Sequence, residues 1–399
     1  MNSRTLQMIV VMVASLATIA ATDIFLPSLP SMATYFSASV DTTQLVVPMY
    51  LMGSLIAAPF MGTLSDIYGR QRILFWGMAL FVVGTAACMT APTLTFLLGA
   101  RFLQGFGAIV SSVVGWALLQ DIYPADEGAK FISWAGSVSC IAPLLAPALG
   151  GYIQITFGWQ GNFFVIFICA VFTLFLMLYS KSEAKPVSGR KKMSPLTTLK
   201  TYRAIITDKP FLFYISFFSL LGSVEWCYLT MIPFYFENTL HISPNVFGLY
   251  LSISAAFYAL GAVVTPWILK RIDINRTLAL GLKITFVAGL FMLFISLFMG
   301  TYPLLIALAM GLYFFGTSIV WGPSVSRALQ RFEEDRGAAS AVRSFLNMTA
   351  FATGGFVGSF LDDSTLVVLA LLLILMAGVC WLIFQNLTKF EATINVKEI

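Results

Sequence analysis

The sequence has few charged residues and almost no histidine. Asp, Glu, Lys and Arg together make up 10% of the 399 positions, and His241 is the only histidine. So few charges cannot cover the surface of a water-soluble protein of this length. There is no GxxxxGK[ST] phosphate loop and no His, Cys and carboxylate cluster with metal-ligand spacing. The inventory therefore argues against an enzyme, and we expect no metal and no cofactor.

The chain also lacks paired cysteines. None of the five cysteines belongs to a CxxC pair, and all fall inside apolar runs. This pattern predicts neither a disulfide framework nor a zinc site, and it indicates packing residues. The five are Cys88, Cys140, Cys169, Cys227 and Cys380.

Apolar residues dominate instead. They make up 59% of the chain and recur in runs long enough to cross a bilayer, which takes about 20 residues for each helix. We predict an all-α integral membrane protein with twelve transmembrane helices. The predicted spans are 7–35, 44–64, 73–91, 95–121, 128–156, 161–181, 210–237, 244–269, 275–298, 302–330, 336–361 and 365–388. The first run resembles a signal peptide only superficially, because it continues past Asp23 to Pro30.

One long polar stretch divides the spans into two sets of six. We therefore predict an N-terminal six-helix bundle at 1–181, a cytoplasmic linker at 182–209 and a C-terminal bundle at 210–399. With both termini cytoplasmic, every Lys and Arg except Arg101, Lys283 and Arg343 lies in or beside a cytoplasmic segment. The basic linker thus sets the topology, and no nucleic-acid partner is expected.

The two predicted bundles repeat each other. Pro59 and Asp66 recur as Pro266 and Asp273, and Gly107 recurs as Gly316 near the end of the matching helix. Six helices and a long inside loop give both halves the same orientation. The expected architecture is therefore two pseudo-symmetric bundles related by an axis along the membrane normal, with a substrate path between them.

The loop between the second and third spans contains a dense motif, which comprises Gly62, Asp66, Gly69, Arg70 and Arg72. The glycines permit close helix approach and a tight turn, and the acid can pair with a nearby cation. This loop resembles the GxLxDxxGRxR signature of the major facilitator superfamily. The resemblance implies the twelve-helix fold of that family and a role for the loop in holding the bundles in the outward-facing state.

Two further segments resemble motifs of the same superfamily. Arg101, Gln104, Gly105 and Gly107 follow its RxxQGxG pattern, which is associated there with proton coupling. The fifth span resembles the antiporter motif of the Bcr/CflA drug-resistance subfamily, through Gly136, Pro143, Pro147, Gly150 and Gly151. Gln120 and Gln160 depart from that subfamily, which commonly has arginines there. The resemblance implies a bacterial cytoplasmic (inner) membrane protein.

Only two acids lie deep within spans, Asp23 and Glu225. Acids inside a membrane are expensive and often mark proton relays. We predict that Asp23, Arg101 and Glu225 form the proton-coupling set, with protons as the coupling ion. Asp23 could instead form a static ion pair with Arg101, and Glu225 could have a structural hydrogen-bonding role.

Polar and aromatic side chains on the fourth, seventh, tenth and eleventh spans are candidates for the substrate cavity, where aromatic rings can stack on flat or cationic compounds. At a lipid interface the same rings are ordinary belt residues. The candidates are Gln104, Trp226, Tyr228, Tyr313 and Arg343.

The function predicted from these patterns is that of a secondary active transporter, a proton-coupled antiporter that exports drugs or small amphipathic molecules by alternating access. We expect it to act as a monomer. Two alternatives within transport stay open: a dedicated exporter of one metabolite such as a siderophore, and a proton-coupled importer. A receptor or scaffold would need neither the midplane acids nor an antiporter-type fifth span.

Overall fold

The computed structural model is helical throughout the residues it describes, which are 3–122, 125–180, 195–332, 335–362 and 364–397. Its description of side chains leaves out residues 3, 120, 125–140, 195–199, 336 and 391–397. No strand occurs in this part of the chain, so the predicted all-α class is confirmed.

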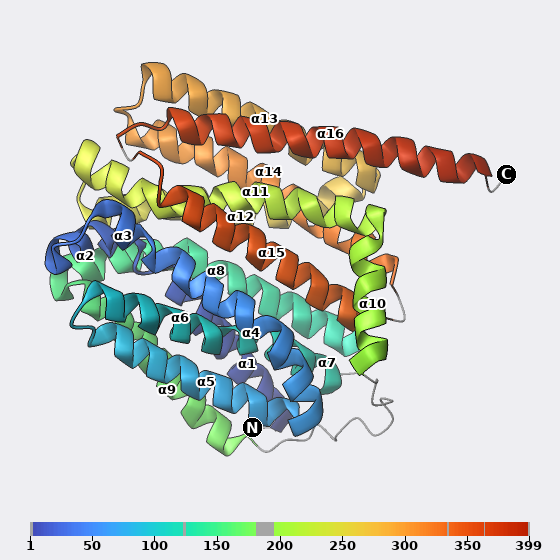
Figure 1. Ribbon diagram of the computed structural model, residues 1–399, viewed down its shortest axis with the longest axis horizontal. Coiled ribbons are helices and arrows are strands. Elements are labelled where there is room, and N and C mark those ends of the chain that lie inside the picture. Colours follow the sequence, from blue (N-terminus) through green and yellow to red (C-terminus); the bar gives the residue numbers. More distant parts are fainter. Residues whose placement is uncertain (1–2, 123–124, 181–194, 333–334, 363, 398–399) are drawn as a thin grey trace. The chain divides into compact units, whose positions relative to one another are not determined.

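The first half of the chain runs from α1 to α9 (Figure 1). The elements are α1 (Ser3–Asp23), η1 (Leu26–Ser28), α2 (Leu29–Phe36), α3 (Val40–Gln44), α4 (Val46–Tyr68), α5 (Arg70–Met89), α6 (Leu94–Val110), η2 (Ser111–Gly115), α7 (Trp116–Ile122), α8 (Ala125–Phe157) and α9 (Trp159–Tyr179).

The second half runs from α10 to α16 (Figure 1). The elements are α10 (Pro195–Thr207), α11 (Lys209–Phe234), η3 (Tyr235–Thr239), α12 (Pro244–Leu269), α13 (Ile274–Phe298), α14 (Pro303–Gln330), α15 (Arg336–Gly358) and α16 (Val367–Lys397).

Long helices occupy the twelve predicted positions, and ten stretches of the described chain are long and apolar enough to cross a membrane. The two predicted spans outside those ten correspond to α8 and α15. In α8, the described apolar stretch is the shorter segment Ile141–Phe157. Helix α15 is less apolar than those ten stretches and contains Arg343 and Asn347. One element was missed: α10 forms a helix within the predicted linker, of which residues 182–194 lie outside the described chain.

The chain forms two compact units. Unit 1 comprises Met1–Lys192 and Thr230–Ser252, and unit 2 comprises Met193–Leu229 and Ile253–Ile399. In unit 1, α6 packs against α4 and α5, while α1 packs against α8 and α9. In unit 2, α13 lies beside α14 and α16, and α10 contacts α15 (Figure 1). The division into bundles at 1–181 and 210–399 stays a prediction.

The segment Thr230–Ser252 belongs to unit 1 because α8 packs against it with almost no side-chain layer between. A Cβ placed on Gly151 would lie 2.3 Å from the Pro244 carbonyl oxygen, and one on Gly248 would lie 2.2 Å from the Pro147 carbonyl oxygen. Glycine is needed at both positions because only it lets two helix backbones approach this closely.

Candidate functional site

The first span breaks immediately after Asp23. Helix α1 ends at Asp23, and a short 3-10 turn with Pro27 leads into α2, which has Pro30 in its first turn. Proline lacks a backbone N–H, so a continuous α-helix is unfavourable here. The Asp23 side chain is buried, with only 8% of its surface exposed. The sequence thus sets an acid at the end of a helix inside unit 1.

Helix α8 holds this break from one side. A Cβ on Gly150 would lie 1.7 Å from the carbonyl oxygen of Ile24, the residue after Asp23. The glycine of the antiporter-like segment therefore sits directly against the backbone that follows the acid. Pro143, Pro147 and Gly151 lie in the same helix, while the surroundings of Gly136 fall outside the described side chains.

Arg101 is the most deeply placed cation of unit 1, with 1% of its surface exposed. Its Nε donates to the carbonyl oxygen of Val46 at 3.1 Å, and its Nη1 donates to the carbonyl oxygen of Ala21 at 3.1 Å. The guanidinium also lies 4.2 Å from the ring centre of Phe25 and 4.5 Å from that of Tyr50. Carbonyl dipoles and aromatic faces thus replace the water that this cation has lost.

Gln104 extends the same network. It accepts a hydrogen bond from Arg101 Nη1 at 2.6 Å and donates from Nε2 to Thr85 Oγ1 at 2.9 Å. Thr85 in turn donates to the Phe81 carbonyl at 2.6 Å. Through these bonds Arg101 ties α6 to α1, α4 and α5. Gln104 is fully buried and is a link in this network, and its predicted place in the substrate cavity stays a prediction.

Asp23 and Arg101 lie close together but form no ion pair among the described side chains. Both interact electrostatically with Tyr50, whose hydroxyl donates to the carbonyl oxygen of Thr18 on α1 at 2.8 Å. The structure therefore gives no support to the static Asp23–Arg101 pair. The carboxyl is left without a permanent counter-charge, as a group that gains and loses a proton requires.

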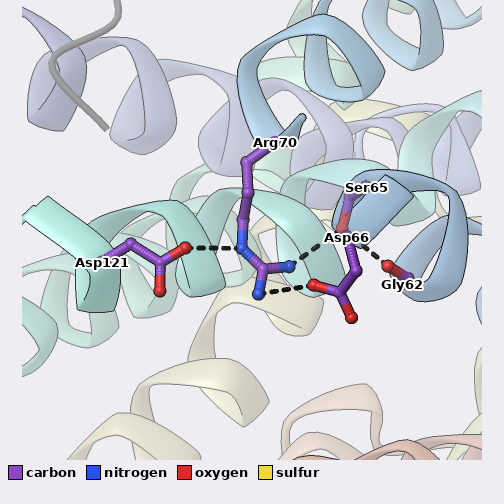
Figure 2. Close-up of polar contacts among 5 residues, drawn as sticks. All are labelled: Gly62, Ser65, Asp66, Arg70 and Asp121. Carbon is purple, nitrogen blue, oxygen red and sulfur yellow. Dashed lines mark hydrogen bonds and ion pairs between the residues drawn. The ribbon is translucent and has the colours of Figure 1, made fainter. Parts of the chain in front are cut away.

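The signature loop forms a compact ionic cluster (Figure 2). Arg70 Nε lies 2.7 Å from Asp121 Oδ2, and its Nη2 lies 2.9 Å from Asp66 Oδ1. Its Nη1 donates to Ser65 Oγ at 2.9 Å, and Ser65 donates to the Gly62 carbonyl at 2.7 Å. Arg70 thereby joins the ends of α4 and α7 to the start of α5.

Gly69 makes this geometry possible. Its φ is +97°, a backbone conformation that favours glycine, and it connects α4 directly to α5. Arg72 is exposed and has a position suited to solvent contact. Asp121 of α7, which was not among the predicted site residues, is the partner that ties the loop to another helix.

The predicted residues of unit 2 separate into two groups. Tyr313 and Tyr228 are almost fully buried, and the Tyr313 hydroxyl donates to the Leu221 carbonyl at 3.0 Å. These two tyrosines pack in the interior of the unit, and their predicted place in the substrate cavity stays a prediction. Glu225 and Trp226 are half-buried, with Trp226 beside Phe351 at 6.2 Å between ring centres.

Arg343 has an unusual environment in unit 2. Its Nη2 donates to Ser344 Oγ at 3.3 Å, and its buried Nε has no hydrogen-bond partner among the described residues. One turn further along α15, Asn347 accepts a bond from Ser219 of α11 at 2.7 Å. Glu225 interacts with Tyr313 rather than lying isolated. The predicted roles of Arg343 in the substrate cavity and of Glu225 in proton coupling stay predictions.

Sequence reasoning missed Asn162 altogether. Its Nδ2 donates to Ser28 Oγ at 2.8 Å and to the Gly150 carbonyl at 3.3 Å, which joins α9 to the break after Asp23. The sequence did contain a signal for this residue. An amide within an otherwise apolar span is costly unless it forms a hydrogen bond, so Asn162 could have been predicted to bond with another helix.

These features define a multi-pass membrane transporter, with a buried acid at a helix break and a separate ionic cluster in the loop between α4 and α5. A family model of the Major Facilitator Superfamily matches residues 11–359. The chain belongs to that superfamily, whose members are transporters rather than enzymes.

Two relatives illustrate the similarity. An uncharacterized transporter of this superfamily, YdgK of Bacillus subtilis, is 26% identical over 92% of this chain and 91% of its own length. The multidrug resistance protein MdtL of Escherichia fergusonii is 28% identical over 81% of this chain and 80% of its own length.

Solved structures share the fold. The xylose transporter XylE from E. coli, in a partially occluded inward open conformation, matches with a TM-score of 0.73 at 15% identity, over 96% of this chain and 98% of that one. A D-xylose-proton symporter matches with a TM-score of 0.74 at 17% identity, over 95% and 98%.

Proposed function

We propose that the chain is a proton-coupled antiporter that exports drugs or other small amphipathic molecules. Drug export is supported by the similarity to MdtL, a multidrug resistance protein. The observation that carries the coupling is Asp23, a buried carboxyl at a helix break with no described ion-pair partner. Intramembrane acids of this kind serve as proton relays because they can be charged in one state and neutral in another.

Arg101 has a supporting role in this proposal. It binds the carbonyl of Ala21, two residues before the acid, so a change in the charge of Asp23 acts on a backbone segment that Arg101 already holds. The network through Gln104 and Thr85 then connects that segment to α5 and α6. Protonation of Asp23 can in this way bias the packing of the unit.

The test combines two measurements on purified protein. Substrate-induced proton release in detergent reports whether substrate and proton compete, and gradient-driven transport in liposomes reports whether they exchange. Asp23→Asn should abolish both while substrate binding persists, because the amide keeps the size of the carboxyl. Asp41→Asn, an exposed acid of the same unit, is the matched control and should behave as wild type.

Two outcomes would overturn the proposal. Wild-type proton release and full transport in Asp23→Asn would remove the coupling assignment, and Glu225 would be the next residue to replace. A panel of unrelated drugs and iron-chelating metabolites identifies the substrate class. Transport of a single metabolite, or uptake with the proton, would replace multidrug export with one of the alternatives.

The proposed orientation places both termini and α10 in the cytoplasm of a bacterial inner membrane. In a variant whose five native cysteines are replaced, Lys200→Cys and Thr239→Cys each introduce a single thiol that tests this in intact cells. An impermeant reagent added outside should label the second and spare the first. The reverse pattern would invert the topology.

A further inference from the structure

Polar side chains of η1, α2, α8 and α9 lie within and just beyond the break that follows Asp23. Asn162 of α9 donates to Ser28 Oγ at 2.8 Å, and Gln154 of α8 donates to Ser31 Oγ at 2.8 Å. The two serines are one helical turn apart. Trp159 lies one turn before Asn162 on α9, with 3% of its surface exposed. We call Ser28, Ser31, Gln154, Trp159 and Asn162 the serine-amide cluster.

Three polar atoms of the serine-amide cluster are buried and have no hydrogen-bond partner among the described residues. They are the indole Nε1 of Trp159 and the amide oxygens of Gln154 and Asn162. Buried polar atoms are nearly always satisfied, because an unpaired one costs about 1–3 kcal/mol. The indole N–H needs an acceptor and the two amide oxygens need donors, so a ligand that can both accept and donate would satisfy all three.

Water fits this set better than an ion does. A cation would be repelled by the indole N–H, and an anion would face two amide oxygens. Buried water typically makes about three hydrogen bonds to such atoms. The cluster contains no charged side chain, and neither α9 nor residues 141–157 of α8 contain an acidic or basic residue. Around Asp23, Tyr50 of α4 interacts electrostatically with the acid, with Arg101 of α6 and with Cys88 of α5, and Asp23 also has a side-chain hydrogen bond with Thr22.

The position of the serine-amide cluster suggests what bound water would do. Asn162 also donates to the Gly150 carbonyl, and Gly150 lies against Ile24, the neighbour of Asp23. At the other side, Trp159 packs on Tyr35 and Phe36 at the end of α2. The cluster thus spans the distance between the acid and the α2–α3 end of unit 1.

We propose that the serine-amide cluster binds water and that this water conducts protons between the α2–α3 end of unit 1 and Asp23. The binding of water stands on the cluster alone, whereas the conduction rests on the proposed function of Asp23.

Hydration is tested without any transport assay. In protein labelled with 15N-tryptophan, the Trp159 indole N–H should exchange with deuterated water although the ring is buried, its signal being assigned with Trp159→Phe. Gln154→Leu should slow that exchange about tenfold, because it removes a polar partner of the water. Thr156→Val, on the exposed face of the same helix, is the control and should leave it unchanged. An indole N–H that does not exchange in the wild type would overturn the proposal.

Conduction is tested by separating equilibrium from rate. In Gln154→Leu, substrate-induced proton release should keep its wild-type amount, while gradient-driven transport should slow about fivefold or more, since a broken water path limits rate only. Asn162→Leu should do the same, and Asn162→Ser, which leaves space for water, should restore most of the rate. Wild-type rates in both leucine variants would overturn conduction. Normal proton release in Asp23→Asn would refute the proposed function instead, without altering the indole result.

Discussion

Gly107 of α6 and Gly316 of α14 make the same contact in the two units. A Cβ on Gly107 would lie 2.7 Å from the Gly77 carbonyl oxygen on α5, and one on Gly316 would lie 2.9 Å from the Gly281 carbonyl oxygen on α13. Helices α5 and α9 also pack together in unit 1, as α13 and α16 do in unit 2. The sequence repeat therefore preserves the backbone packing of one helix pair in each unit.

The polar content around that shared contact differs. By the offset that relates Gly107 to Gly316, Arg101 corresponds to Met310 and Gln104 to Tyr313. Met310 is fully buried, whereas Arg101 binds two backbone carbonyls and Gln104. The helix packing around this glycine is therefore common to both units, while at the position of Arg101 only unit 1 has a cation.

The loop between α4 and α5 in unit 1 and the loop between α12 and α13 in unit 2 also differ in their ion pairs. Arg70 of unit 1 bridges Asp66 and, across helices, Asp121. In unit 2, Asp273 and Arg276 form an exposed local pair at 3.2 Å. By the offset that relates Gly107 to Gly316, Gln330 of unit 2 corresponds to Asp121 of unit 1. Only the loop of unit 1 therefore ties separate helices together through its arginine, among the ion pairs of the described residues.

The largest expected effect on transport comes from Arg101→Met, which gives unit 1 the methionine that unit 2 has at the corresponding position, Met310. The change leaves the carbonyls of Ala21 and Val46 and the Gln104 amide without their donor, at about 1–3 kcal/mol for each unpaired group. We expect gradient-driven transport to fall at least about a hundredfold, since in the proposed mechanism Arg101 holds the backbone next to Asp23 and packing alone cannot replace it. Met310→Leu, the matched change in unit 2, should keep most activity. Full transport by Arg101→Met would reduce Arg101 to a structural role.

The loop comparison predicts the next effect. Arg70→Ala should lower transport about tenfold while the protein reaches the membrane at near-normal levels, because the loop is proposed to latch a conformational state. Arg276→Ala should be nearly silent, since exposed pairs contribute about 0–1 kcal/mol. A double-mutant cycle with Asp121→Ala measures the cross-helix coupling. Equal transport by the two alanine variants would show that the loop serves topology only.

The shared glycine contact predicts a smaller effect on stability. Gly107→Ala and Gly316→Ala should each lower the free energy of unfolding by about 1–3 kcal/mol, because the added Cβ meets the backbone of the neighbouring helix. Gly99→Ala is the control, since a Cβ there meets nothing within 4 Å. Thermal unfolding in detergent measures all three. A destabilisation confined to one unit would contradict the common scaffold.

Several features that depend on local sequence were predicted, whereas contacts between residues far apart in the chain were not. Apolar length predicted the spans because a bilayer imposes it directly, and the repeat located Gly316 from Gly107. The break after Asp23 was not predicted, because the span 7–35 was treated as one helix although it contains Pro27 and Pro30. The Arg70–Asp121 bridge was not predicted, because it joins residues 51 positions apart. Helix α10 was missed because a polar linker has no apolar run long enough for a span.

The candidate site was predicted by residue type more readily than by contact. Arg101 was identified, but its partners are backbone carbonyls, which have no sequence signature. Gln104, Tyr228 and Tyr313 were assigned to a cavity because polar and aromatic groups within spans suggest one, yet their polar atoms are satisfied within the units. Asn162 shows the converse, since its role depends on Ser28, which lies 134 positions earlier.

The smallest expected effect concerns a bridge between α14 and α11 in unit 2, which has no counterpart among the described ion pairs of unit 1. Arg331, at the end of α14, donates from Nε and Nη2 to the two carboxylate oxygens of Asp208 at 2.8 Å each. Asp208 also accepts from the Phe211 N–H at 2.8 Å and so caps α11. Arg331→Ala should therefore lower stability by only about 1 kcal/mol, because the bridge is partly exposed while the cap persists. Asp208→Ala removes cap and bridge together and should lower stability about twice as much, whereas Asp208→Asn retains the cap. Thermal unfolding of the three variants separates the two contributions, and transport by Arg331→Ala should stay well above that of Arg70→Ala. If Arg331→Ala instead impaired transport as strongly as Arg70→Ala, both units would contain a cross-helix latch, and the contrast between their loops would have to be abandoned.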